Sequence, residues 1–416
     1  MNETPVPSTR TRSREQLADY LLEMGATLAS SGCPSYRLED VVRAVADAEG
    51  YDAEVFALPT GLFLRVRSKE GGHAEVHRMT RVKDWGVDLM RLTMVDEIWN
   101  DVVDKKVSIE NARIRIRDVV KAPPKWSQAM VWAASTVSSG AAAVFFRGTA
   151  VDVLVSALVG AVIGGARILV SQRHAQRLLN DFLGGLFAAA CAWLATRIWH
   201  QSSPEVVVLA GAISLFPGLT FTTGLSEVAQ KNLISGGGRL MESAVTLLLI
   251  LFGVALVAGF QQIAGVTLPV FPKRVGLDLP WQAAALVSAS IAFGIEFQVP
   301  KRFLWAALLS GATGYIVTAV AVHRLPTHVA AFCAALAVCV LANALARITQ
   351  RPAQLFQVPG MMLLVPGSFG FLSLGDFLRG HILEGAAKGF NMALVGAALV
   401  IGVLVANVVL PPRKLL

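Results

Sequence analysis

Long runs of uncharged apolar residues dominate the chain from Trp126 to its end. The runs cover residues 126–146, 153–166, 182–196, 206–226, 243–272, 279–295, 303–322, 325–346, 352–375 and 389–412. About 20 apolar residues in a helix span the hydrocarbon core of a bilayer, and lipid offers no partner to an unpaired backbone group. The sequence therefore predicts ten transmembrane helices, in keeping with a hydrophobic content of 54%.

Charge divides the chain into two regions. Residues 1–125 carry 19 Lys and Arg against 20 Asp and Glu, whereas the remainder carries 18 against 9. The net charge of +8 therefore belongs to the loops of the apolar region, as the positive-inside bias predicts, and not to a phosphate-binding face. We expect a lipid bilayer and no nucleic acid as partner, with both termini on the cytoplasmic side.

The cysteines and the N-terminal segment both favour a reducing compartment. Cys33, Cys191, Cys333 and Cys339 form no CxxC pair, so we interpret them as small buried residues. The first 16 residues lack the apolar segment of a secretory signal. We therefore expect the region before Trp126 to stay in the cytoplasm.

This first region has the pattern of a small soluble domain. Apolar residues at helical spacing predict helices at 13–31, 36–49, 84–104 and 108–120, with Ser13 as an N-cap. Between the second and third helices, alternating segments predict an antiparallel meander at 53–58, 62–67 and 73–79. The sequence thus predicts a two-layer α/β domain over 13–122, after a disordered segment at 1–12.

Side chains with reactive chemistry in this domain form no established motif. His73 and His77 lie on one face of a predicted strand with Cys33 upstream, but the spacing matches no zinc site. A hydrolase could be assembled on paper from Ser31, Ser35, Asp40 and His73, yet no G-x-S-x-G elbow is present. We therefore predict no catalytic residue, no metal and no cofactor.

The apolar region contains an internal repeat. Residues 211–244 align without a gap on residues 360–393, so that Pro217-Gly218 matches Pro366-Gly367. We place a first five-helix repeat at 123–262, a connecting loop at 263–280 and a second repeat at 281–416. Five is an odd number, so the two repeats run in opposite senses across the membrane. Such inverted repeats are typical of secondary transporters, in which one site is exposed to each side in turn.

Both Pro-Gly pairs lie within the fourth span of their repeat. Proline removes a backbone donor and glycine relaxes the helix, so both spans are expected to break near the bilayer centre. A half-helix N-terminus attracts a carboxylate, and freed carbonyls with nearby hydroxyls suit an ammonium group. The alternative is a pair of ordinary kinks whose Ser and Thr only pack helices. The predicted substrate-binding residues are Pro217, Gly218, Thr220, Thr223, Pro366, Gly367 and Ser368.

Acidic residues near the spans fall into two groups. Glu227 and Asp376 are paired by the repeat, ten residues after each proline, and we hypothesise that one or both carry a coupling proton. Asp152 and Glu296 are interpreted as interfacial capping residues. Polar and charged residues expected around the coupling carboxylates are Lys231, Arg239, Glu242, Lys388 and Asn391.

Three segments together resemble the threonine/serine exporter family. They are SSGCPSYRLEDVVRAVADAEGY, FPGLTFTTGLSEVAQKNLISGGGRLMESA and FQVPGMMLLVPGSFGFLSLGDFLRG, and the likeness extends from about residue 13 to 410. The resemblance implies a bacterial inner-membrane protein with ten spans and a cytoplasmic domain, which exports threonine and serine by proton antiport. Some relatives are similar to this chain split in two after the fifth span, near residues 262–280.

Other functions stay open at this stage. The chain could be a membrane-anchored hydrolase with its chemistry in residues 13–120, or an exporter of a different small solute. The soluble domain could instead sense a cytoplasmic ligand and regulate transport. The sequence leaves the oligomeric state undetermined, a homo-oligomer included.

Overall fold

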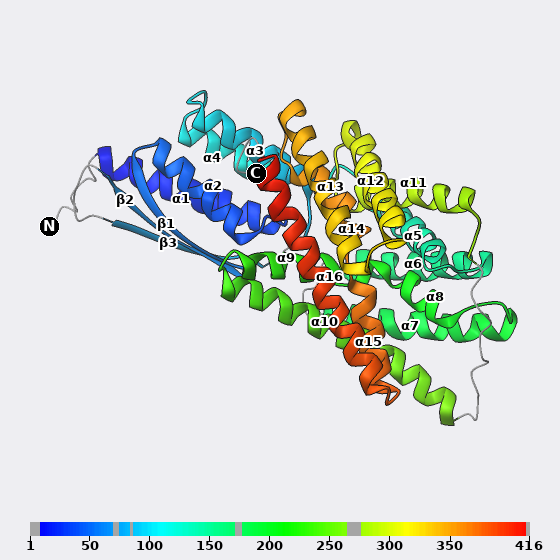
Figure 1. Ribbon diagram of the computed structural model, residues 1–416. Coiled ribbons are helices and arrows are strands. Elements are labelled where there is room, and N and C mark those ends of the chain that lie inside the picture. The colour runs from blue at the N-terminus through cyan, green and yellow to red at the C-terminus, as the bar shows by residue number, and fades with distance from the viewer. Residues whose placement is uncertain (1–8, 70–74, 84–85, 171–176, 264–275, 413–416) are drawn as a thin grey trace.

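The computed structural model describes residues 9–69, 75–83, 86–170, 177–263 and 276–412. An N-terminal domain of four helices and three strands lies at one end of a larger bundle of helices (Figure 1). His73, the first eight residues and most of the predicted connecting loop at 263–280 lie outside the described residues.

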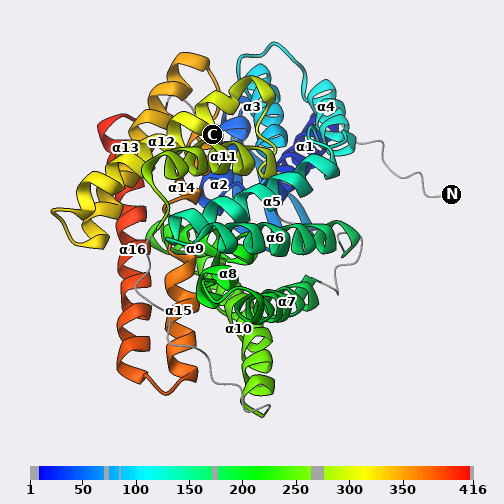
Figure 2. The same ribbon diagram turned by 90° about the vertical axis from the view of Figure 1, so that its right-hand side faces the viewer.

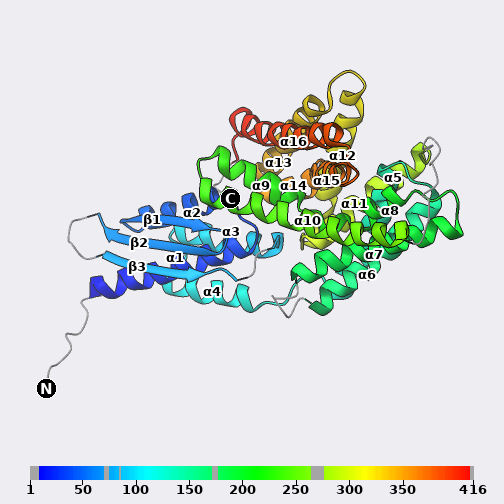
Figure 3. The same ribbon diagram turned by 90° about the horizontal axis from the view of Figure 1, so that it is seen from below.

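The N-terminal domain has the predicted order of elements. Its three strands form one antiparallel sheet in the order β1-β2-β3, in which Phe56 faces Phe63 and Phe63 faces Met79. The helices cover one face of this sheet (Figure 3). The elements are α1 (Thr9–Ser30), α2 (Ser35–Ala48), β1 (Tyr51–Leu58), β2 (Gly61–Ser68), β3 (Glu75–Arg81), α3 (Leu89–Val103) and α4 (Ile109–Lys121).

Local sequence explains most of these boundaries. The Asp88 side chain accepts a hydrogen bond from the Arg91 N–H at the start of α3, and the Ser108 side chain accepts one from Asn111 N–H at the start of α4. The predicted cap at Ser13 is wrong, because α1 already begins at Thr9. Arginine is a good helix former, so the polar segment before Ser13 continues the helix instead of ending it.

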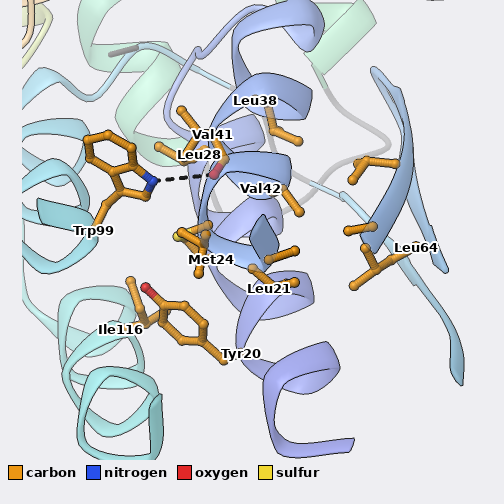
Figure 4. Packing of buried hydrophobic residues seen from close by; sticks show 14 of the residues in the cluster. Tyr20, Leu21, Met24, Leu28, Leu38, Val41, Val42, Leu64, Trp99 and Ile116 are labelled. Atoms are coloured by element: carbon orange, nitrogen blue, oxygen red, sulfur yellow. Dashed lines mark hydrogen bonds between the residues drawn. The ribbon is translucent and has the colours of Figure 1, made fainter. Parts of the chain in front are cut away.

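The core of the domain lies between the helices and the sheet. Figure 4 shows Leu21 of α1 and Val42 of α2 on the side that faces Leu64 of β2, and Met24 of α1 on the side of Trp99. The Trp99 indole N–H donates to the Val41 carbonyl at 3.3 Å, so this large ring is buried with its polar atom satisfied. The domain thus has a hydrophobic core of its own.

The larger bundle contains a helix, or a broken pair of helices, at each of the ten predicted runs. The elements are α5 (Gln128–Phe145), α6 (Ala150–Val170), α7 (Arg177–Ile198), α8 (Pro204–Gly211), η2 (Ile213–Leu215), α9 (Gly218–Ala229), α10 (Leu233–Ile263), α11 (Leu279–Glu296), η3 (Lys301–Phe303), α12 (Leu304–Val322), α13 (Thr327–Thr349), α14 (Gln354–Met362), α15 (Gly367–Leu378) and α16 (Ile382–Val409).

Among the described residues, seven segments are long and apolar enough to cross a membrane, and the bent pair of α8 with η2–α9 makes eight. The two remaining predicted spans correspond to α5 and α11. Both have only 18 residues and carry serines within their apolar sequence. These helices pack on each other through Ala141, Val144, Ala285, Ala289 and Phe293.

Several turns of the bundle touch the N-terminal domain. The Leu89 N–H donates to the Phe297 carbonyl after α11 at 3.0 Å, and Arg351, just after α13, pairs with Glu97 of α3. The C-terminal end is tied to the same side, since Arg347 donates to the Pro411 carbonyl. The turn between α15 and α16 lies at the end of the bundle away from this domain (Figures 1 and 2).

Candidate functional site

The two predicted helix breaks are present, and they meet inside the bundle. α8 and η2–α9 are bent by 47° across their junction, and α14 ends at Met362 before α15 begins at Gly367. A Cβ added to Gly218 would overlap the side chain of Val365 and lie 3.3 Å from Gly367 N. Only glycine permits this approach, so the repeated Pro-Gly steps bring the two breaks into contact.

A cavity of about 650 Å³ lies on one side of this contact. Gly218, Gly367 and Ser368 line it from the breaks. Its polar lining includes Gln282 and Tyr315, whose hydroxyl donates to Gln282 Oε1 at 2.8 Å. Residues just after α5, just before α11 and just after α12 complete its wall.

A second cavity of about 260 Å³ lies on the other side, beneath the N-terminal domain. Pro217, Thr220 and Thr223 line it from the first break, and Tyr36 and Arg37 line it from α2. Two residues, Phe216 and Met362, line both cavities. The Phe216 ring also packs on Phe371, with ring centroids 5.4 Å apart. Phe216 and Met362 therefore form a thin layer between the two cavities.

The predicted substrate-binding residues are distributed over both cavities. Gly218, Gly367 and Ser368 face the larger one, and Pro217, Thr220 and Thr223 face the smaller one. Pro366 is buried at the start of α15 and lines neither of these two cavities. Sequence reasoning therefore located the breaks but did not anticipate that two cavities flank them.

Glu227 lies at the junction of the bundle and the N-terminal domain. Its carboxylate is fully buried and accepts hydrogen bonds from Ser35 N–H at 2.9 Å, Ser235 Oγ at 2.8 Å and Arg239 Nε at 3.1 Å. The Ser35 and Ser235 hydroxyls are 2.6 Å apart. Asn232 adds a contact from the same turn to Glu39 of α2 at 3.4 Å. The charge of Glu227 is thus neutralised where the two parts of the protein meet.

Asp376 forms the corresponding ion pair at the opposite end. Its carboxylate lies 2.5 Å from Lys388 Nζ, and His381 pairs nearby with Glu384 at 3.1 Å. Asp376, His381 and Glu384 offer ligand atoms within 4.8 Å of one another, but His381 and Glu384 are exposed and Lys388 already occupies Asp376. Both cations, Arg239 and Lys388, follow their carboxylate by twelve residues, so this pairing repeats in both halves.

The other polar residues predicted around these carboxylates are placed differently. Lys231 occupies the turn after α9 with a φ of 66° and is exposed, as is Asn391 on α16, while Glu242 is half-buried on α10. None of the three lines either cavity described above. They differ from Arg239 and Lys388, which bind the two carboxylates directly.

Asp152 and Glu296 are held by hydrogen bonds near helix ends. Asp152 accepts from Thr149 N–H, Ser202 Oγ and Ser203 N–H, each at 2.8 Å, as the capping interpretation predicts. Glu296 accepts from Ser138 Oγ at 2.8 Å across α5 and α11. Asp152 thus joins two turns, and Glu296 joins two helices.

The residues considered for chemistry in the N-terminal domain do not converge in the described part of the chain. Ser31 donates to the Thr27 carbonyl, Ser35 contacts Ser235, and Asp40 pairs with Arg43 on the surface. Cys33 is buried, and burial raises the pKa of its thiol to about 12. His77 is 70% exposed and lies 3.4 Å from Glu75. His73, which belongs to both the metal and the hydrolase readings, lies outside the described residues.

The cavity-lining residues that sequence reasoning missed lie at contacts between distant segments. Phe216 precedes the first break and could have been noticed from its position. Arg37 and Gln354 carry no local signal, because they reach the smaller cavity only through the docking of α2 and the entry of α14. A single sequence does not encode either arrangement as a motif.

Together, the broken helices, the flanking cavities and the apolar bundle define a multi-pass membrane protein with an additional N-terminal domain. The family model "Putative threonine/serine exporter" matches residues 19–261, and the model "Threonine/Serine exporter, ThrE" matches residues 282–409. The chain therefore belongs to the threonine/serine exporter family, which confirms the resemblance noted from the sequence.

Curated fungal relatives are similar over most of this chain. "Pheromone-regulated membrane protein 10" of Yarrowia lipolytica is 23% identical over 86% of this chain and 30% of its own length. The proteins of that name from Kluyveromyces lactis and Eremothecium gossypii are 22% identical over 87% and 83% of this chain, and over 38% and 47% of theirs. The chain thus spans less than half of these relatives.

These relatives are membrane proteins of yeasts, so they give no support to the bacterial inner membrane expected from the resemblance. No solved structure matches this chain.

Proposed function

We propose that the protein is a secondary active transporter that exports small hydroxylated amino acids such as L-threonine and L-serine. The observation that carries the proposal is the pair of cavities on opposite sides of the two helix breaks, separated by Phe216 and Met362. A site between two such cavities can open to one side and then to the other. Membership in the threonine/serine exporter family supports the substrate class.

Contacts that recur in both halves support an inverted repeat of five helices each. At two close contacts between helices in the first half, a glycine meets a residue of a neighbouring helix. The equivalent positions of the second half make the same two contacts. The matched contacts are Ser139–Gly160 with Ser290–Gly311, and Phe182–Gly253 with Phe332–Gly402. Equivalent residues are 149 to 151 positions apart, so the likeness extends beyond the segments that align in sequence.

The contacts of the turns support ten spans and their orientation. The turns after α9, α11 and α13 all touch the N-terminal domain, which requires each intervening pair of spans to cross and return. Lys231, Lys301, Arg302 and Arg351 lie in these turns, and cytoplasmic loops are the ones enriched in Lys and Arg. We therefore place the N-terminal domain in the cytoplasm and the larger cavity on the outer side, in the plasma membrane of a bacterium as the resemblance implies.

For coupling, we propose that Glu227 and Asp376 bind the transported proton. Each carboxylate is paired with a cation in this conformation, so a proton and the cation compete for the same oxygen atoms. The two pairs lie at opposite ends of the bundle, one toward each compartment. In Glu227→Gln and Asp376→Asn, we expect a pH gradient to lose its effect on transport. An unchanged response in both variants would contradict this assignment.

The substrate is tested by counterflow in proteoliposomes. Vesicles loaded with unlabelled threonine should accumulate labelled threonine and serine and should discriminate against valine, which has the shape of threonine without the hydroxyl donor. A site that hydrogen-bonds a hydroxyl leaves polar groups unpaired when valine binds, so a large preference is expected. Equal counterflow of valine and threonine would show that the site does not recognise the hydroxyl group, and no counterflow at all with folded protein would refute the export of threonine.

A membrane-anchored hydrolase is the second candidate. No observation on Ser31, Ser35 and Asp40 favours it, because these residues make separate contacts. Hydrolysis by the full-length protein that stops in Ser35→Ala, with counterflow absent, would favour it over transport.

A further inference from the structure

The N-terminal domain contacts both halves of the bundle at one end. On the first half, the Ser35 N–H of α2 donates to Glu227 of α9 at 2.9 Å. On the second half, the Leu89 N–H of α3 donates to the Phe297 carbonyl after α11 at 3.0 Å. In alternating access the two halves rock against each other. The domain therefore bridges two parts of the protein that the proposed cycle separates at this end.

The same domain forms one wall of the smaller cavity. Pro34 and Val87 line this cavity from turns of the domain, Leu219 lines it from the first half and Val358 from the second. The cavity has a volume of about 260 Å³, against about 650 Å³ for the cavity on the other side of the helix breaks. The unequal volumes fit a conformation that is closed on the side of the N-terminal domain.

The contact with the second half is apolar and continuous with the bundle. Leu89 is 1% exposed and belongs to one hydrophobic cluster with Val299, Phe303 and Phe356 of that half. The chain that leaves the domain is fixed to the same half, because the Trp126 indole N–H donates to the Val299 carbonyl at 2.7 Å. Separation here would expose apolar surface to water, which is unfavourable. This contact is therefore expected to persist.

The contact with the first half depends on hydrogen bonds. Besides the Ser35 N–H, the carboxylate of Glu227 binds Ser235 Oγ at 2.8 Å, and the Ser35 and Ser235 hydroxyls lie 2.6 Å apart. In the β1–β2 turn, Pro59 Cγ lies 3.5 Å from the position of a Cβ on Gly238 of α10. Opening this contact returns its polar groups to water, which supplies replacement hydrogen bonds. This is the contact that can open and close.

We propose that the N-terminal domain is the gate of the smaller cavity. The domain has its own hydrophobic core, so it moves as one body, and it stays with the second half through α3. Its α2 helix and β1–β2 turn separate from α9 and α10 each time the cavity opens to the cytoplasm, and they dock again when it closes. This inference rests on the proposed function and gives the N-terminal domain a part in each transport cycle.

The test fixes each contact in turn with a removable cross-link in the full-length protein. Pro59→Cys with Gly238→Cys spans the first-half contact, where the two side-chain positions are close enough for a disulfide after oxidation. Glu97→Cys with Arg351→Cys spans the second-half contact at an ion pair of long side chains. A bis-methanethiosulfonate reagent, which a reductant cleaves, bridges this second pair. Mass spectrometry verifies that each link has formed.

The two links should have opposite effects on transport. We expect the first-half link to abolish threonine counterflow in proteoliposomes, and a reductant to restore it, because the gate then opens again. The second-half link should leave the rate equal to that of the reduced protein, because the domain already moves with that half. Each variant is compared before and after reduction, so any loss caused by the substitutions themselves cancels.

Hydrogen exchange provides a readout that needs no substrate. The Ser35 and Leu89 amides each donate across one of the two contacts, so their exchange reports how often each contact opens. In wild-type protein in nanodiscs, the Ser35 amide should exchange faster than the Leu89 amide. The first-half link should slow exchange at Ser35, and the second-half link should leave it unchanged.

The results separate a failure of the gate from a failure of the proposed function. If wild-type protein transports threonine, then full counterflow with the first-half link, or its loss with the second-half link, refutes the gate. If wild-type protein shows no counterflow of threonine, the proposed function fails. The exchange comparison still decides whether the domain separates from the first half, since equal exchange at Ser35 and Leu89 refutes the gate in either case.

Discussion

Glu227→Gln is the substitution whose effect the structure predicts most sharply. It keeps the size of the side chain and removes its charge, while Arg239 stays 9% exposed beside it. Removing one partner of a buried ion pair leaves an uncompensated charge and costs about 3–5 kcal/mol. The amide also offers one acceptor oxygen to the three donors, Ser35 N–H, Ser235 Oγ and Arg239 Nε. The contact between α2 and the α9–α10 turn should therefore weaken.

Asp376→Asn provides the matched control, because it removes the equivalent carboxylate at the other end. The Lys388 side chain is 39% exposed, so water can solvate the cation when its partner is lost. Exposed pairs contribute about 0–1 kcal/mol, and the control should lose no more than about that amount. The two substitutions therefore differ by about 2–5 kcal/mol, the difference between the two cited ranges.

The assay is denaturant unfolding of the full-length protein in one detergent, extended to a double-mutant cycle with Arg239→Met. Removing the cation together with the carboxylate should recover part of the loss, which gives a coupling energy of about 0.5–3 kcal/mol. Equal losses in Glu227→Gln and Asp376→Asn, or a cycle without coupling, would refute the argument from burial.

Two further predictions follow from close contacts and from charge. Gly218→Ala places a methyl group against Val365 and should cost about 1–3 kcal/mol with loss of transport, whereas Gly237→Ala meets no atom within 4 Å and should be tolerated in a transport assay. Burial raises the pKa of Glu23, but hydrogen bonds from two arginines, Arg117 first, outweigh this and lower it below its ordinary value of 4.5. This contribution to stability is complete above that value and disappears as pH falls through the lowered pKa, so Glu23→Gln should flatten the acid limb of stability measured against pH.

The sequence predicted the helices and strands far better than the contacts between them. Periodicity located the meander and the flanking helices of the N-terminal domain. One hydrophobic core lies between the helices and the sheet, so it sets the apolar pattern of both layers. The Pro-Gly steps indicated the breaks because proline and glycine act on the local backbone. The error at Ser13 arose because a cap is a weak signal where the preceding residues also favour a helix.

The candidate site was predictable only in part, for a physical reason. The repeat matched Glu227 with Asp376 and Arg239 with Lys388, and the structure forms the two ion pairs Glu227–Arg239 and Asp376–Lys388. The contact of Ser35 with Glu227 joins residues 192 positions apart, and no local pattern records such a contact. The inward position of Arg37 depends on that docking. Long-range docking therefore accounts for most of what the sequence left open.

The thinness of the layer formed by Phe216 and Met362 has an electrical consequence. On the proposed arrangement, with one water-filled cavity toward each compartment, each cavity would carry the potential of its own compartment almost to that layer. The membrane voltage would then fall mainly across that layer instead of the whole bilayer. The free energy of a net charge that crosses this layer in one step would change by about 2.3 kcal/mol per elementary charge for each 100 mV. The membrane voltage would therefore act on the step in which charge passes these two side chains.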